Sequence, residues 1–225
     1  MEVLSVTASA LQFLSERIIT GELKPGQKLN ESTLSVQMGI SRPPLREALR
    51  LLEKDHLVVN IPRRGTYVAG LSVQDFIEIS QVREMIECYT IDLLEAAGTR
   101  NLPRVTTALD KALNLPMPLK SADPKDVLDY IKVFLDFHHS LVESSGNSLL
   151  TQTYRSISLY LARYQFIYFH IDGTAQRSLR DHSRTIEFIR KGKYDQAREE
   201  LRKHIQYAVE IVKNWISQPA LSRTG

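Results

Sequence analysis

A segment near residue 40 has the pattern of two short helices separated by a glycine turn, and this pattern constrains the fold more than any other. Asn30 can cap a first helix that reaches Met38, and Gly39 supplies the turn. A second helix begins after Ser41, a residue type that often caps helices. Prolines follow at once, and they cost little there because the first N–H groups of a helix are unpaired. Helix, short turn and helix together predict a helix-turn-helix.

The second of these helices has one apolar face and one basic face. Its apolar residues repeat at helical spacing: Leu45, Ala48, Leu49 and Leu52. Its arginines recur every four residues on another face: Arg42, Arg46 and Arg50. Guanidinium groups bind phosphate and read guanine edges, and the N–H groups at a helix start attract anions. The pattern therefore favours a surface for a polyanion.

Two short β-prone runs follow this helix, at 57–59 and 66–68. The residues between them, Pro62 to Gly65, form a basic hairpin tip that contains Arg63 and Arg64. Helices followed by a two-stranded wing predict a winged helix-turn-helix. Between Arg42 and Arg64, six basic residues stand against three acidic ones. That excess of positive charge is modest, and exposed arginines are common on solvated helices. The order of helix, turn, helix and basic wing is therefore more specific for DNA binding than any one of these elements alone.

The rest of the chain has the periodicity of helices and no credible strand. Ser72 with Asp75 is an N-cap signature that opens a long helix. Further helices are expected at 102–113, 123–145, 149–169, 174–191 and 195–217. The predicted domains are 1–70 and 71–217, with a loose tail at 218–225. The predicted fold is mainly α: an N-terminal winged helix-turn-helix with a small two-stranded wing, then an all-α antiparallel helical bundle.

Three histidines of the expected bundle lie on or beside apolar stripes of different helices: His138, His182 and His204. A single histidine in such a position is more often a satisfied core residue than a ligand. Three neutral imidazoles can bind a divalent metal if they meet in the centre of the bundle. Spacing along the chain does not show that they meet, so the residues alone leave both interpretations open.

Composition narrows the class of protein only a little. The formal charge of +3 on 225 residues permits nucleic-acid binding without requiring it. Cys88 is the single cysteine, which excludes an internal disulfide framework and fits a reducing cytoplasm. No secretory signal is visible, and the apolar segment 157–169 is too short to span a bilayer. We therefore expect a cytoplasmic protein with no membrane partner.

Residues 11–70 resemble the DNA-binding domain of GntR-family bacterial transcription regulators. The resemblance is carried by the runs at 19–26, 29–31, 41–49 and 64–68. It implies that Arg42 and Arg46 read the operator from the recognition helix, with Ser41 and Arg50 beside them. It also implies that Arg64 and Gly65 reach the minor groove from the wing tip. A further contact of the family, in the preceding helix, falls on Ser32 in this chain.

Residues 72–217 resemble the FCD ligand-sensing domain of the FadR-like branch of the same family. The segments that carry the resemblance are Phe137-His138, the run 144–147, Asp181-His182, the turn 192–195 and Lys203-His204. The resemblance implies that the three histidines hold a divalent metal such as Zn or Ni. It also implies effector contacts from Arg83 and Asn147. Arg83 and Glu87 lie i and i+4, however, and pairing with each other is an equally good interpretation.

One position departs from the FCD pattern. The family's fourth metal ligand is an aspartate four residues before the first histidine, and Phe134 stands there in this chain. Asp136 is near, but it lies about 200° around the helix from His138 and should point away. The site is therefore expected either to use three histidines, with water or an effector carboxylate completing the shell, or to have lost its metal and become more apolar.

The resemblances imply a homodimeric transcription regulator, a repressor rather than an activator and not an enzyme. Its expected partners are double-stranded operator DNA and a small carboxylate metabolite that modulates operator affinity. Two alternatives remain at this point. In one the metal ion itself is the signal. In the other, three histidines activate water in a hydrolase, although no carboxylate stands out as a general base beside them.

Overall fold

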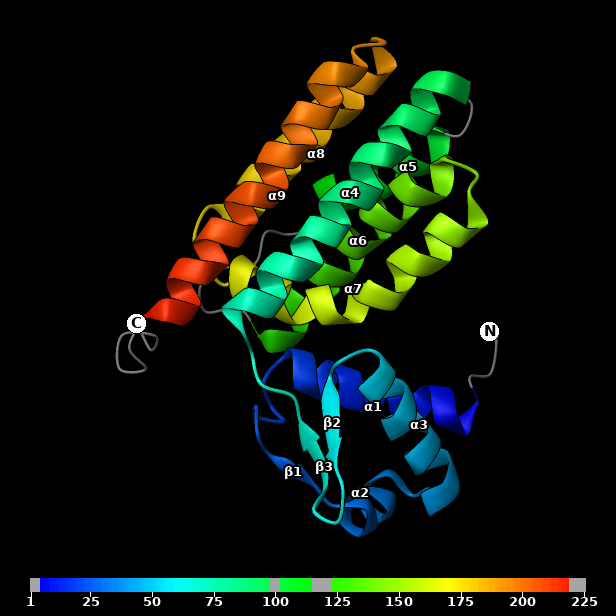
Figure 1. Ribbon diagram of the computed structural model, residues 1–225, viewed down its shortest axis with the longest axis vertical. Helices are drawn as coiled ribbons and strands as arrows, with labels where there is room; N and C mark the ends of the chain where they lie inside the picture. The colour runs from blue at the N-terminus through cyan, green and yellow to red at the C-terminus, as the bar shows by residue number, and fades with distance from the viewer. Residues whose placement is uncertain (1–4, 98–101, 115–122, 219–225) are drawn as a thin grey trace. The chain divides into compact units, whose positions relative to one another are not determined.

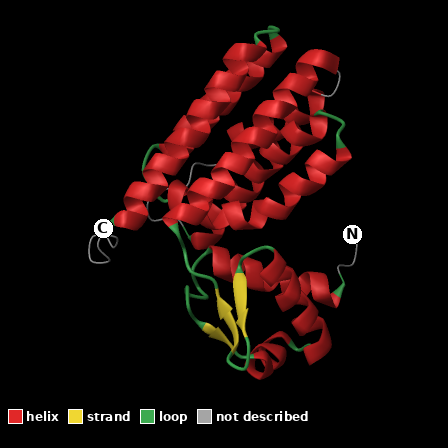
Figure 2. Cartoon of the chain, viewed as in Figure 1, coloured by secondary structure: helices red, strands yellow, loops and turns green. Residues whose placement is uncertain are grey.

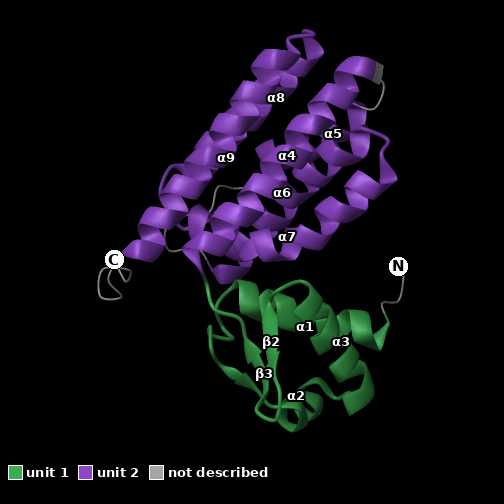
Figure 3. Cartoon of the chain, in the orientation of Figure 1, with its two compact units in different colours: residues 1–71 green, residues 72–225 purple. Residues whose placement is uncertain are grey.

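The computed structural model describes residues 5–97, 102–114 and 123–218. The chain divides into two compact units, 1–71 and 72–225, with the division one residue beyond the expected boundary (Figure 3). Helices dominate both units, and strands occur only in the first among the residues described (Figure 2). Apart from Gln218, the tail expected at 218–225 lies outside the described residues. None of the described helices combines the length and apolarity that a membrane crossing requires.

The first unit is a winged helix-turn-helix (Figure 1). Its helices are α1 (Val6–Ile19), α2 (Glu31–Met38) and α3 (Arg42–Lys54), and its strands are β1 (Lys28–Leu29), β2 (Val58–Ile61) and β3 (Gly65–Val68). Asn30 caps α2, as expected, and Gly39 ends it with a φ of +63°. That left-handed backbone suits glycine, and it turns the chain directly into α3.

The wing has one strand more than the sequence predicted. The sheet is antiparallel with order β1-β3-β2, and β1 pairs Lys28 with Tyr67 and Leu29 with Thr66. A strand of two residues is too short to show an alternating pattern, so periodicity could not find it. Leu29 of this short strand is buried in the core of the unit, and its burial anchors the segment before α2.

The second unit is a helical bundle, and the part of the chain that the structure describes contributes six helices to it. They are α4 (Val73–Ala97), α5 (Leu102–Leu113), α6 (Pro124–Ser144), α7 (Ser148–Phe169), α8 (Thr174–Arg190) and α9 (Tyr194–Ser217). The predicted cap of α4 is present, because Ser72 Oγ accepts from the Asp75 N–H at 3.2 Å. Helix α4 packs against α6 and α9, and α9 packs against α8 (Figure 1). The three histidines of interest, one each on α6, α8 and α9, are buried.

Candidate nucleic-acid interface and metal centre

Helix α3 exposes its arginines because the opposite side of the helix is buried in the core. The apolar residues predicted for the buried side are all buried: Leu45, Ala48, Leu49 and Leu52. Burying that side fixes the rotation of the helix about its axis, so the opposite side must face solvent. The exposed arginines are Arg42, Arg46 and Arg50. The structure thus presents three guanidinium groups on the outside of one short helix.

Two of these arginines are held by the first turn of α2. Arg46 Nε donates to Glu31 Oε2 at 2.7 Å, and Arg42 Nη2 donates to Ser32 Oγ at 2.9 Å. The sequence placed Ser32 where the family makes a further DNA contact. In the structure its hydroxyl instead accepts from Arg42. Glu31 was not singled out from the sequence, since it lies fifteen residues before its partner.

Ser41 occupies the N-cap position of α3, but its side chain makes no capping hydrogen bond. An N-cap side chain accepts from the second or third N–H of its helix, and here those positions are Pro43 and Pro44, which have none. Ser41 therefore stands at the N-cap, as predicted, but lacks the capping hydrogen bond for a reason visible in the sequence. The same prolines remove two of the free N–H groups expected to attract anions, so positive charge at this helix start comes from arginine side chains.

The wing tip is exposed and basic, as expected. Arg64 N–H donates to Ile61 O at 2.9 Å, which closes a tight turn between β2 and β3. Arg63 has a φ of +64° and Gly65 a φ of +104°, both in the left-handed region. A backbone of that kind projects the side chains at 63 and 64 from the end of a narrow hairpin, where they are exposed.

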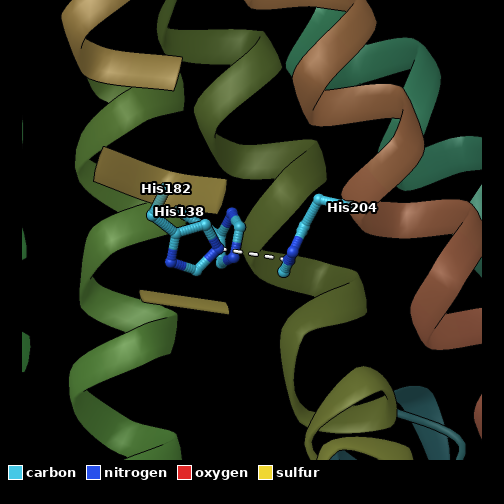
Figure 4. A group of neighbouring side chains, drawn as sticks. All are labelled: His138, His182 and His204. Carbon is cyan, nitrogen blue, oxygen red and sulfur yellow. Dashed lines mark hydrogen bonds between the residues drawn. The ribbon is translucent and has the colours of Figure 1, made fainter. Parts of the chain in front are cut away.

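The three histidines meet. His138 of α6, His182 of α8 and His204 of α9 each offer a ring nitrogen, and these atoms lie within 4.8 Å of one another. Figure 4 shows the imidazoles gathered together, with His182 Nε2 3.1 Å from His204 Nε2. Two ligands on a tetrahedral zinc ion stand about 3.3 Å apart, since each Zn–N bond is about 2.0–2.1 Å. The pair therefore already has nearly the separation that a shared ion requires.

Carboxylates bind the far side of two of these rings. Glu87 Oε2 lies 3.0 Å from His138 Nδ1, and Asp181 Oδ2 lies 3.4 Å from His204 Nδ1. A carboxylate on Nδ1 fixes the ring orientation and leaves the Nε2 lone pair for a metal. His182 Nδ1 is buried without a hydrogen-bond partner among the described residues. Two of the three imidazoles are thus supported by a carboxylate, and a set of three imidazoles fits a divalent ion such as Zn or Ni.

Arg83 reaches the same centre from α4. Its Nε donates to Glu87 Oε1 at 2.8 Å, as the i, i+4 spacing allowed, and its Nη2 lies 2.7 Å from His138 Nε2. Arginine is only a donor, so His138 must accept through Nε2 and donate through Nδ1 to Glu87. That tautomer is also the one a metal needs. Arg83 and a metal would therefore use the same lone pair of His138.

Burial controls the charge of this cluster. It lowers the pKa of all three imidazoles, and with the Arg83 charge it lowers the pKa of His138 to about 4. For Glu87, burial alone would raise the pKa, but Arg83 and His138 outweigh it and hold that pKa far below its usual range. At neutral pH the imidazoles are thus neutral, which is the ligand form, and Glu87 is charged.

The expected fourth position contributes a ring instead of a ligand. Phe134 is buried, and its ring centroid lies 5.2 Å from that of His182. Asp136 points away, as predicted, and pairs with Lys111 at 3.4 Å. A cavity of about 20 Å³ lies beside the histidines. This volume is enough for a single water molecule. Its aromatic lining comprises Phe76, Phe134, Tyr164, Tyr168 and Phe169.

The structure separates the two residues that the FCD resemblance assigned to the effector. Arg83 lines the cavity, whereas Asn147 does not. Asn147 is the N-cap of α7, and its Oδ1 accepts from the Leu150 N–H at 3.1 Å. A Gly-Asn pair between helices has this local use, so the assignment of Asn147 to the effector is not supported by its position. His139 packs beside the site and contacts Ser158 Oγ at 2.7 Å.

Comparison with known proteins decides the family. A family model described as bacterial regulatory proteins, gntR family, matches residues 7–68, and the FCD domain model matches residues 78–207. The chain is a GntR-family transcriptional regulator with an FCD domain. Among similar proteins, YdhC of Bacillus subtilis, an uncharacterized HTH-type transcriptional regulator, is 29% identical over 92% of both chains. The repressor RspR of Escherichia coli is 25% identical over 92% of this chain and 89% of its own.

Solved structures of GntR regulators have the same fold. A regulator from Rhodococcus sp. RHA1 aligns with a TM-score of 0.73 at 22% identity, covering 94% of this chain and 99% of that one. McbR/YncC of E. coli aligns with a TM-score of 0.73 at 18% identity, covering 96% and 100%. These likenesses support the winged helix-turn-helix and the FCD bundle as an architecture.

Glu87 should be essential to the stability of the FCD domain. It is fully buried and accepts from Arg83, His138 and the Tyr154 hydroxyl, the last at 2.6 Å. We expect Glu87→Ala to lower the free energy of unfolding by about 3–5 kcal/mol, since it strands a buried guanidinium. Urea unfolding followed by circular dichroism measures this loss.

A matched control lies one turn away on α4. Glu84 forms a more exposed pair with Arg202 at 3.0 Å, so Glu84→Ala should cost less than about 1 kcal/mol. Replacing both charges, as Arg83→Met with Glu87→Leu, should be less harmful than Glu87→Ala alone. If Glu87→Ala and Glu84→Ala lower the free energy of unfolding by equally small amounts, the buried ion pair contributes no more to stability than the exposed one.

Proposed function

We propose that this GntR regulator binds operator DNA through Arg42, Arg46, Arg50 and Arg64, and that a small carboxylate metabolite bound in the FCD domain changes operator affinity. The observation that carries the proposal is the set of exposed arginines on α3, two of them oriented by α2, beside a basic wing tip. An arginine can donate two parallel bonds to a guanine edge, and each such contact discriminates by about 1–3 kcal/mol. Repression is favoured over activation because several relatives carry repressor names, among them the gluconate operon repressor of Bacillus licheniformis.

The Ser41 hydroxyl and the Gly65 backbone belong to the same proposed surface. Ser41 is exposed, and its side chain is not used in the cap of α3, so the hydroxyl is available to a phosphate oxygen. Gly65 is exposed at the wing tip, and a residue without a side chain lets a narrow hairpin approach a groove closely.

We infer that the three histidines hold a divalent ion and that the effector binds beside it. Arg83 lines the cavity, and an ion on His138 Nε2 would take the lone pair that Arg83 uses. Arg83 would then turn its planar fork toward a carboxylate, which is the ligand that such a fork matches. An effector regulates only if it binds two arrangements of the regulator with different affinity, and a rearranged Arg83 provides such a difference.

The rival hydrolase has less support from the geometry. A zinc hydrolase needs a general base free to take a proton from bound water. The carboxylates nearest the histidines, Glu87 and Asp181, lie against Nδ1 atoms on the far side of the rings. They orient the imidazoles, and the family to which the chain belongs is one of regulators. We therefore propose no enzymatic activity.

A dimer is expected to bind a palindromic operator, and helix α4 carries a candidate dimer interface, called the seam below. Among the described residues of this helix, Val82, Met85 and Tyr89 are large apolar side chains exposed by 37%, 65% and 49%. They repeat at i, i+3 and i+7, so they form one stripe. The chemistry of such a stripe suits an identical stripe on a second copy, related by a two-fold axis, and a two-fold dimer matches a palindromic operator.

Arg46→Ala should weaken operator binding by about 5- to 150-fold, which corresponds to about 1–3 kcal/mol, and should reduce discrimination between operator and unrelated duplex. Fluorescence anisotropy against a duplex selected from random sequences measures both. Wild-type affinity should also fall steeply with salt, because phosphate contacts release counterions. Arg104→Ala is the control, since Arg104 is equally exposed and pairs with Glu143 in the FCD domain. Unchanged discrimination in Arg46→Ala would refute its role.

Purified protein should bind one divalent ion per chain, and His182→Ala should weaken that binding more than roughly tenfold. Native mass spectrometry with Zn²⁺ or Ni²⁺ measures ion occupancy and reports any co-purified acid. His139→Ala is the control, because His139 contacts Ser158 outside the cluster. Equal ion occupancy in His182→Ala and wild type would contradict the site. Operator affinity that responds to the ion without any acid would favour the metal-responsive alternative.

Met85→Glu should convert the dimer to monomer at micromolar concentration, because the substitution places a charge in the centre of the apolar stripe. Size-exclusion chromatography with light scattering measures the mass. Leu113→Glu is the matched control, since Leu113 is also exposed, by 52%, but lies on α5. A Met85→Glu protein that remains dimeric would place the seam elsewhere.

A further inference from the structure

The first turn of α2 makes contacts with α3 that folding alone does not explain. Glu31 accepts from Arg46 Nε at 2.7 Å, and the neighbouring Ser32 accepts from Arg42 Nη2 at 2.9 Å. The Arg46 side chain remains 65% exposed, and an exposed ion pair of this kind contributes little to stability. Consecutive residues of one helix thus hold consecutive arginines of another at little gain for the fold.

The helix turn that carries Glu31 and Ser32 is itself held in place by a cap and by packing. Asn30 Oδ1 accepts from the N–H groups of Ser32 and Thr33 at 2.9 and 3.1 Å, which caps α2 at this turn. Leu34 of the same helix is buried against the core of the unit. The position of the Glu31 carboxylate relative to α3 is therefore set by packing and capping.

The atom that Glu31 contacts decides what Arg46 can still do. A guanidinium carries five N–H donors in a rigid plane. The carboxylate accepts from Nε, so the edge formed by the two terminal nitrogens stays available for two parallel bonds to a guanine. A free arginine side chain has many rotamers, and it loses that conformational entropy on binding. Fixing the side chain beforehand reduces that loss for a contact in the correct place.

The charge of Glu31 acts on every duplex alike, whatever its sequence. A carboxylate on the recognition surface repels phosphates, and phosphate attraction provides nearly all of the non-specific affinity. Arg50 offers a contrast, because its partner Glu47 lies on the same helix at i, i+3 and links α3 to no other element. For the arginines of α3, the contacts given by the described residues to Arg42 and Arg46 come from a second helix, α2.

We propose that Glu31, assisted by Ser32, is a positioning residue that sets operator specificity. Glu31 orients Arg46 for base reading before DNA arrives. Its charge weakens the attraction of every duplex alike, so the orientation of Arg46, not the charge, provides the discrimination. The proposal rests on the operator-binding function proposed above. It differs from that function in assigning specificity to residues that need not touch DNA.

The test compares affinity for the selected duplex with affinity for a shuffled duplex of equal length, in wild type and Glu31→Ala, by fluorescence anisotropy. We expect Glu31→Ala to bind the shuffled duplex more tightly and the selected duplex no more tightly. The ratio of the two affinities should fall by about five- to tenfold, within the range that one base contact provides. Glu31→Gln should keep much of the ratio, because its amide oxygen still accepts from Arg46 Nε.

Glu47→Ala is the charge-matched control. It removes one negative charge from α3 itself, where Glu47 contacts Arg50, and should tighten binding to both duplexes equally and leave the ratio unchanged. If Glu31→Ala behaves like Glu47→Ala, Glu31 acts only through its charge and the proposal is overturned. Circular dichroism melting confirms that each variant is folded.

A double variant separates failure of this proposal from failure of the function beneath it. If Glu31 acts through Arg46, adding Glu31→Ala to Arg46→Ala should lower the ratio no further. An Arg46→Ala protein that keeps the full ratio would refute operator reading by Arg46 itself. A reduced ratio in Arg46→Ala with an unchanged ratio in Glu31→Ala would leave operator reading intact and refute the positioning role alone.

Discussion

A single buried carboxylate, that of Glu87, determines how the interior of the FCD domain is arranged. It receives bonds from Arg83 on its own helix, from His138 on α6 and from Tyr154 on α7. A charge removed from water must be fully hydrogen-bonded, or its burial costs several kcal/mol. These three helices therefore cannot shift independently of Glu87. The tautomer of His138, and with it the direction of the Nε2 lone pair, follows from this one requirement.

The two units solve the problem of orienting polar side chains in different ways. In the FCD domain, burial excludes water, so a few hydrogen bonds are enough to fix the imidazoles and keep them neutral. In the winged head, the arginines of α3 are exposed, and there their hydrogen bonds compete with water. Orientation there depends on a second helix close by, and the short turn at Gly39 brings α2 to α3 at the required distance.

Periodicity predicted most of the fold, since the stripe of Leu45 to Leu52 and the cap at Ser72 follow from local rules. It missed β1 because two residues carry no period. Residue preferences predicted Ser41 correctly as the N-cap of α3, but no capping hydrogen bond forms because Pro43 and Pro44 have no N–H groups to donate.

The three-histidine cluster was predictable only in part. That His138, His182 and His204 meet could not be derived from spacing, because it depends on how α6, α8 and α9 pack; the family resemblance supplied it. The pairing of Glu87 with Arg83 was visible as i, i+4 spacing. Its bond to His138, and the bond of Asp181 to His204, join residues on different helices, and no local pattern contains that information.

The replacement of a carboxylate ligand by Phe134 changes the charge that a bound ion would present. Neutral imidazoles do not reduce the double charge of a divalent ion, whereas an aspartate ligand would halve it. Glu87 is already matched by Arg83, and Asp181 lies against His204 and near Arg177 at 3.5 Å. An ion held by these three histidines would therefore attract an anion into the aromatic cavity more strongly than a site with its own carboxylate. The aromatic walls contribute apolar contact but no charge, so the positive charge facing this cavity would come from the ion and from Arg83.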